Sequence, residues 1–85
     1  GMKIFGLYFV WRGGTIMQAL SNAARGTYTI QWMFGLPEVL KQLQEWQICE
    51  GSMIQVIAKY KHALLIGSNS RRFIIDNEIA DRIRV

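Results

Sequence analysis

The sequence predicts a small, mainly β domain with one α-helix, folded as an antiparallel barrel. Two stretches, residues 27–34 and 53–59, alternate apolar and polar side chains, as a barrel wall with one wet face requires. Between them, residues 36–46 place apolar side chains three and four positions apart, which indicates an amphipathic helix. Because 85 residues suffice for one domain only, we expect a single core.

The chain is predicted to consist of an N-terminal extension, residues 2–16, and a barrel domain, residues 17–85. The glycine pair Gly13-Gly14 marks the turn between them. The run from Ile4 to Trp11 is rich in β-forming residues and is predicted to be an extra strand. It is far shorter than the roughly 20 residues that a bilayer helix needs, so we expect no membrane insertion. With little charge to protect its edge, this strand should pair with a second copy and give a homodimer.

The first barrel strands are expected after a short strand at residues 16–20 and a loop at residues 21–26. Residues 27–34 are predicted to form one strand, which Gly35 ends. Its alternation gives one apolar, inward face. That face consists of Tyr28, Ile30, Trp32 and Phe34.

The predicted helix carries one apolar stripe that should plug the barrel. The stripe consists of Leu36, Val39, Leu40, Leu43 and Trp46. Pro37 suits the first helical turn, where its missing N–H would have no partner. Lys41, Gln44 and Glu45 face away from the stripe and should be exposed.

Three further strands are predicted in the C-terminal half. They cover residues 53–59, 63–66 and 71–75, separated by turns at 60–62 and 67–70. Asp76 and Asn77 can cap a short helical turn at residues 78–81. Residues 82–85 would then close the barrel.

The chemistry-bearing residues are few, and we expect no enzyme. The chain has one cysteine, Cys49, and one histidine, His62, and it lacks a phosphate-binding loop or a triad-like spacing. A single cysteine excludes an internal disulfide and fits a reducing cytoplasm. If Cys49 and His62 converged in space, two ligands would give at most a weak Fe²⁺ site. We therefore expect no cofactor.

The net charge of +4 leaves one alternative function open, a small basic barrel that binds nucleic acid. Cations flank an aromatic residue in Arg71-Arg72-Phe73 and in Lys59-Tyr60-Lys61, a mixture that single-strand binders use. Acidic residues are interleaved with the cations, however, and no block of like charge occurs. In a half-buried strand Phe73 would point inward, so we favour a solvated strand face over a nucleic-acid site.

The pattern of small and apolar positions from Met17 to Val85 resembles the FeoA family of ferrous-iron transport proteins. The resemblance rests on three segments, which are Gly26-Thr27-Tyr28-Thr29-Ile30, the loop closing on Gly51-Ser52, and the layout from Met53 through Arg72-Phe73-Ile74-Ile75-Asp76 to Ile83-Arg84-Val85. Three positions depart from the family pattern. Gln47 and Ser70 stand where family members carry glycine, and Glu50 stands where a proline often precedes the loop glycine.

The resemblance implies an SH3-like β-barrel and a role as a cytoplasmic accessory of ferrous-iron uptake. The partner that the resemblance implies is the membrane transporter FeoB, which has a cytosolic GTP-binding domain. The implied activity is docking without tight binding of iron. For this chain the expected contact residues are Lys41, Gln44 and Glu45 on the helix and Arg71 and Arg72 on a strand.

Overall fold

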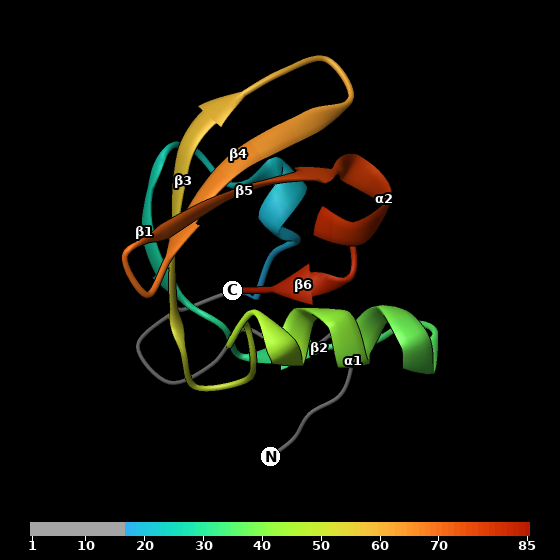
Figure 1. Cartoon of the computed structure of the whole chain (residues 1–85). Coiled ribbons are helices and arrows are strands. Elements are labelled where there is room, and N and C mark those ends of the chain that lie inside the picture. The colour runs from blue at the N-terminus through green and yellow to red at the C-terminus, as the bar shows by residue number, and fades with distance from the viewer. Residues whose placement is uncertain (1–16) are drawn as a thin grey trace.

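The computed structural model describes residues 17–85 and shows a β-barrel built from two antiparallel sheets (Figure 1). The predicted fold class, mainly β with one main helix, is confirmed. The predicted N-terminal extension, residues 2–16, lies outside the described residues, and so do its extra strand and the homodimer contact. The elements in chain order are a 3₁₀ turn η1 (Leu20–Asn22), β1 (Gly26–Thr29), β2 (Trp32–Met33), α1 (Pro37–Glu45), β3 (Met53–Lys59), β4 (Ala63–Ser68), β5 (Arg71–Asp76), α2 (Asn77–Ala80) and β6 (Ile83–Arg84).

The core lies between the two sheets. The larger sheet has the strand order β1-β3-β4-β5, and the smaller one pairs β2 with β6. α1 runs below the barrel in Figure 1 and buries Leu43, with Val39 and Trp46 packed against the core. The largest fully buried side chains come from both sheets and the connecting segments, and they are Leu20, Ile30, Ile48, Ile54, Leu64, Ile66, Ile83 and Val56.

The predicted strand at residues 27–34 is two strands with a corner between them. At the corner Ile30 N–H donates to the Ser52 carbonyl (2.9 Å), and Gln31 N–H donates to the Arg84 carbonyl (2.8 Å). The chain thus leaves the larger sheet and joins the smaller one. This change of partner shifts the alternation by one residue. Met33 therefore packs on the core, while Trp32 and Phe34, predicted inward, are exposed.

The end of α1 forms a Schellman motif around Gln47. Ile48 N–H donates to the Leu43 carbonyl (2.8 Å), and Gln47 N–H donates to the Gln44 carbonyl (2.9 Å). The motif requires a left-handed backbone at Gln47, whose φ is 63°. Leu43 and Ile48 are both buried, which supplies the hydrophobic contact typical of this motif.

The segment before β1 differs from the predicted strand and loop. Gln18 and Val85 exchange backbone hydrogen bonds of 3.0 and 2.9 Å, and Ala19 forms an isolated antiparallel bridge with Arg84. η1 follows, where a loop was predicted, and Leu20 and Ala23 are both fully buried in the core.

A bulge in β3 changes the side on which Lys59 lies. The register shifts between Val56 and Ala58, so Lys59 leaves the face that Met53 and Gln55 share. The Lys59 ammonium donates to the Ala23 carbonyl (2.9 Å). The predicted alternation therefore holds only as far as Val56.

The strand β4 continues to Ser68, past the predicted end at residue 66, so the turn to β5 has two residues. Asn69 and Ser70 both have a left-handed backbone, with φ of 54° and 65°, as a type I′ hairpin turn requires. After β5, the Asp76 carboxylate accepts the Ile79 N–H (2.9 Å), which confirms the predicted cap of α2.

Candidate partner-binding surface

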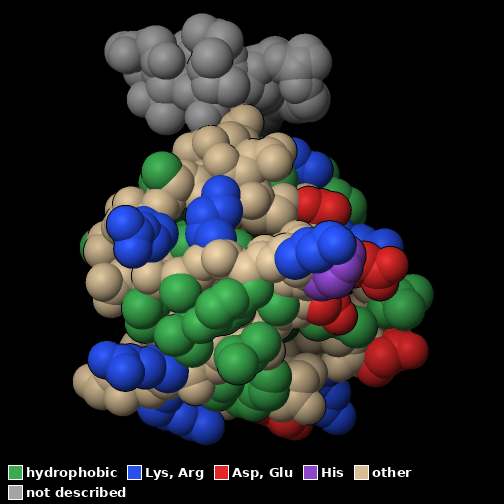
Figure 2. Space-filling view, turned by 90° about the horizontal axis from the view of Figure 1, so that it is seen from above, with side chains coloured by type: hydrophobic (Ala, Val, Ile, Leu, Met, Phe, Trp, Pro, Cys, Tyr) green, Lys and Arg blue, Asp and Glu red, His purple; other side chains and the backbone are tan. Residues whose placement is uncertain are grey.

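The outer face of the larger sheet is exposed and largely apolar at its centre. The register places Ile57, Leu65 and Ile74 on this face, together with Met53 at its lower end. Ile74 is 67% exposed and Met53 is 60% exposed, unusually high fractions for large apolar side chains in strands. Figure 2 shows a continuous apolar patch with lysine and arginine side chains along its margins. Exposed apolar patches of this kind on small domains typically mark interaction surfaces.

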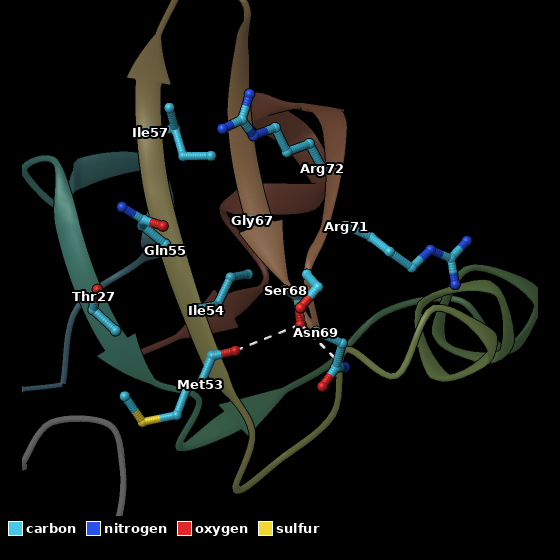
Figure 3. A pocket seen from close by; sticks show the side chains of 11 residues that line it. Thr27, Met53, Ile54, Gln55, Ile57, Gly67, Ser68, Asn69, Arg71 and Arg72 are labelled. Atoms are coloured by element: carbon cyan, nitrogen blue, oxygen red, sulfur yellow. Dashed lines mark hydrogen bonds between the residues drawn. The ribbon is translucent and has the colours of Figure 1, made fainter.

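A shallow groove of about 430 Å³ crosses this face over Gly67 (Figure 3). Gly67 opens the groove because it has no side chain, and a Cβ there would lie 3.2 Å from Ile57 Cδ1. Polar groups of Gln55 and Asn69 border it, and Asn69 Nδ2 donates to the Ser68 hydroxyl (3.4 Å). The groove therefore combines the apolar side chains of Met53 and Ile57 with hydrogen-bonding groups and the two arginines.

The two predicted contact arginines line the groove but point to opposite sides of β5. Arg72 reaches over the outer face, while Arg71 extends away from it (Figure 3). The Arg71 guanidinium lies 5.1 Å from the centre of the Phe73 ring, which in turn stacks on Trp46 with ring centres 4.4 Å apart. Among residues 17–85 no carboxylate forms an ion pair with either arginine. Both charges are therefore available to a partner.

The predicted contact residues of the helix form a separate set. Lys41, Gln44 and Glu45 are exposed on α1, as expected. None of them lines the groove. The stack of Arg71, Phe73 and Trp46 connects the two sets, because Trp46 caps the end of α1. The structure thus brings Arg71 close to the helix, but it does not merge the predicted residues into one site.

The two candidate metal ligands do not converge. Cys49 precedes β3, where its sulfur lies 3.2 Å from the Ser52 hydroxyl, and exposed His62 follows β3 in the turn to β4. At about 3.3 Å per residue, the strand between them spans roughly 20 Å. Within residues 17–85, no three side chains of His, Cys, Asp or Glu gather as a metal site.

Three apolar residues in and near β2, which are Trp32, Phe34 and Leu36, are exposed although they were predicted to face the core. Trp32 and Phe34 contact each other with ring centres 4.9 Å apart, and the Arg84 guanidinium lies 5.5 Å from the Phe34 ring. Leu36, at the start of the predicted apolar stripe, is also exposed. For Trp32 and Phe34 the sequence carried no sign of this, because the corner at Ile30 is set by the partner strands.

Phe73 and Tyr60, the aromatic residues flanked by cations in the two candidate nucleic-acid motifs, have different surroundings. Phe73 packs between Trp46 and Arg71, so its ring is not open for stacking with a base. The Lys59 ammonium donates to the Ala23 carbonyl, whereas Tyr60 is exposed.

In the part of the chain that the structure describes, no helix has the length and apolar character to span a bilayer.

No curated protein sequence matched the chain. The family model of the FeoA domain, however, matches residues 19–85. The chain belongs to the FeoA family. The match covers the whole barrel and α1. Gln47 and Ser70, which stand where the resemblance places glycines, fit this assignment, because both adopt the left-handed backbone that glycine favours.

Solved structures confirm the SH3-like fold of this FeoA domain. A crystal structure of an iron uptake regulatory protein (FeoA) superposes with a TM-score of 0.74 at 22% identity, covering 81% of this chain and 95% of that one. An FeoA-like protein from Clostridium acetobutylicum gives 0.69 at 11% identity, covering 80% and 83%. A manganese-dependent transcriptional repressor gives 0.74 at 17% identity, but the match covers only 45% of that chain and 86% of this one.

Proposed function

We propose that this FeoA domain is a non-enzymatic, cytoplasmic accessory of ferrous-iron transport that docks on the cytosolic domain of a FeoB-type transporter. Membership of the FeoA family, whose members are small accessory domains and not a known class of enzymes, supports the link to iron. The observation that carries the docking role is the exposed outer face of the sheet, with its groove and its two unpaired arginines.

The chemistry of this face fits an acidic protein partner that carries one or two apolar side chains. The apolar side chains of Met53, Ile57 and Ile74 would be buried on binding, which supplies the affinity. Arg71 and Arg72 would meet carboxylates at the margin, which speeds association and orients the complex. Arginine suits this role because its planar fork binds carboxylates in a bidentate manner.

Docking in this form requires no iron site in the domain. Cys49 and His62 lie too far apart to share one ion, so the described residues offer weak single ligands only. Fe²⁺ is then the cargo of the transporter, and the domain acts on the transporter itself.

The test is a calorimetric titration of the full chain into the purified cytosolic domain of a FeoB-type transporter. We expect Arg71→Glu and Arg72→Glu each to weaken binding about tenfold, because a desolvated carboxylate of the partner would then face a like charge. Lys41→Glu is the matched control on α1 and should leave the affinity unchanged. If Lys41→Glu weakens binding and the arginine variants do not, docking uses the helix and the sheet proposal is wrong.

A parallel titration with a single-stranded oligonucleotide separates the alternative function. Binding to phosphates would fall steeply with salt, with log K linear in log salt. We expect no measurable binding at physiological salt. Tight, salt-sensitive binding that Arg72→Glu abolishes would favour a nucleic-acid partner over the transporter.

A further inference from the structure

Within residues 17–85, the strand β5 is an open edge of the larger sheet, since β4 is its only partner strand there (Figure 1). Ser68 and Arg71 close the two-residue turn and lie opposite each other in the register. In a hairpin of this kind the closing pair exchanges hydrogen bonds, and bonded pairs then alternate along the ladder. The odd-numbered residues of β5 therefore bond to β4, whereas Arg72 and Ile74 point their N–H and C=O groups away from it.

These outward groups have no hydrogen-bond partner among the described residues. In residues 17–85, no other segment donates to or accepts from the backbone of Arg72 or Ile74. An edge with such unpaired groups is a template for a further strand unless charge, proline or a bulge protects it. β5 contains no proline, and its register with β4 has no bulge. Its protection consists of charges at its two ends, which are of opposite sign.

We propose that β5 pairs with β5 of a second copy in a two-fold, antiparallel dimer centred on Ile74. An antiparallel register that places Ile74 opposite Ile74 of the second copy also places Arg72 opposite Asp76, once on each side of the axis. Both members of each pair lie on the outer face of the sheet, because Arg72, Ile74 and Asp76 are two residues apart. The register also matches the hydrogen bonding, since Ile74 presents both its outward groups on the axis.

The side chains at the edge are complementary only in this register. Ile74 is 67% exposed in the single chain, and two copies would bury each other at the axis. Side chains directly opposite on neighbouring strands have Cβ atoms about 4.5–5.5 Å apart, within reach of an Arg–Asp ion pair. Asp76 remains available for it, because one carboxylate oxygen accepts the Ile79 N–H while the other has no partner within residues 17–85. A shift by two residues would instead place Arg72 against Ile74.

The dimer extends the sheet of four strands across the axis into one of eight. The groove over Gly67 lies mainly on β3 and β4 and reaches β5 at Arg71 and Arg72, and Arg71 points to the other side of β5. Because Arg72 and Ile74 serve both proposed contacts, the two are separated by residues that serve one only. Arg71→Glu should weaken docking and leave the dimer intact, whereas Asp76→Arg should abolish the dimer and leave docking intact.

The decisive experiment mixes two charge-reversed full-length chains and measures mass by sedimentation equilibrium. Arg72→Asp places two carboxylates opposite each other, and Asp76→Arg places two guanidinium groups opposite each other, so each variant alone should be monomeric. In the mixture, every contact of the heterodimer joins opposite charges, and a dimer should return. We expect each single variant to raise the dimer dissociation constant about tenfold or more.

Two further variants control for folding and for position. Asp76→Asn keeps an oxygen for the cap of α2 and removes the charge, so it should weaken the dimer less than Asp76→Arg. Ile74→Lys should give a folded monomer, because this side chain is already exposed, whereas Met53→Lys on the same face should remain dimeric. Thermal melting of each variant reports whether it is folded.

The proposal is overturned by any of three results. The first is a native chain that stays monomeric up to roughly millimolar concentration. The second is an Ile74→Lys variant as dimeric as the native chain, which would place the contact elsewhere, the extension at residues 2–16 included. The third is a mixture of the two folded, charge-reversed variants that stays monomeric.

Discussion

Replacing Gln47 or Ser70 by glycine should stabilise the protein. Both residues hold a left-handed backbone, with φ of 63° and 65°. For a residue with a Cβ this conformation costs roughly 1–2 kcal/mol. Glycine removes that cost but loses roughly 0.5–1 kcal/mol of backbone entropy on folding. The expected net gain is therefore about 0.5–1 kcal/mol at each position.

The contacts around the two residues should survive the substitutions. The Gln47 carbonyl accepts from Asn69 Nδ2 (3.3 Å) and from the Ser52 hydroxyl (3.4 Å), and glycine keeps that carbonyl. Ser70→Gly converts the turn to Asn-Gly, the favoured sequence of a type I′ hairpin. Since neither side chain is buried, no packing is lost.

Urea unfolding and calorimetric melting of the single and double variants measure the effect. One kcal/mol raises the melting temperature of a domain of this size by roughly 4–8 °C. Gln42→Gly, in the interior of α1, is the matched control and should lose about 1 kcal/mol. Gly51→Ala tests the converse, because its φ is 89° with nothing within 4 Å of an added Cβ, so any loss is due to the backbone. If Gln47→Gly and Ser70→Gly both destabilise, the two turns do not carry the strain described above.

Three further predictions concern the core, the corner and the metal. Trp46→Ala should lower the free energy of unfolding, measured in urea, by about 3 kcal/mol, because Trp46 is partly buried and stacks on Phe73. A melting temperature within two degrees of the parent would contradict this. Trp32→Ala should cost less than about 1 kcal/mol, since this ring is 49% exposed, whereas an equal loss for the two tryptophans would place Trp32 in the core. Calorimetry with Fe²⁺ under anaerobic conditions should detect no stoichiometric sub-micromolar site, and a Cys49→Ala variant should bind as the native chain does; a tight site lost on this change would refute the separation of the ligands.

The helix and the C-terminal strands were predictable because their signals are local. The apolar stripe of α1, the proline at its start and the cap at Asp76 each depend on residues close in sequence. The left-handed positions at Gln47 and Ser70 were visible only by comparison with the family, since their side chains give no sign of it.

The parts that escaped prediction depend on distant partners. The corner at Ile30 exists because Ser52 and Arg84 bond to adjacent residues of one segment, and no local pattern encodes that exchange. The bulge in β3 is set by its pairing with β4, and it alone decides where Lys59 points. The groove was missed for the same reason, because Gly67 matters only through its neighbours on β3 and β5.

The pairing of Gln18 with Val85 and of β2 with β6 has a consequence for the order of folding. The meander β3-β4-β5 is built from hairpins with short connections, whereas the smaller sheet joins segments that are far apart in the chain. Closing such long loops costs entropy before any contact compensates for it. We therefore expect the meander to form the folding nucleus and the smaller sheet to dock afterwards. Conservative substitutions at Ile66 should then slow folding, while those at Ile83 should mainly accelerate unfolding in stopped-flow experiments.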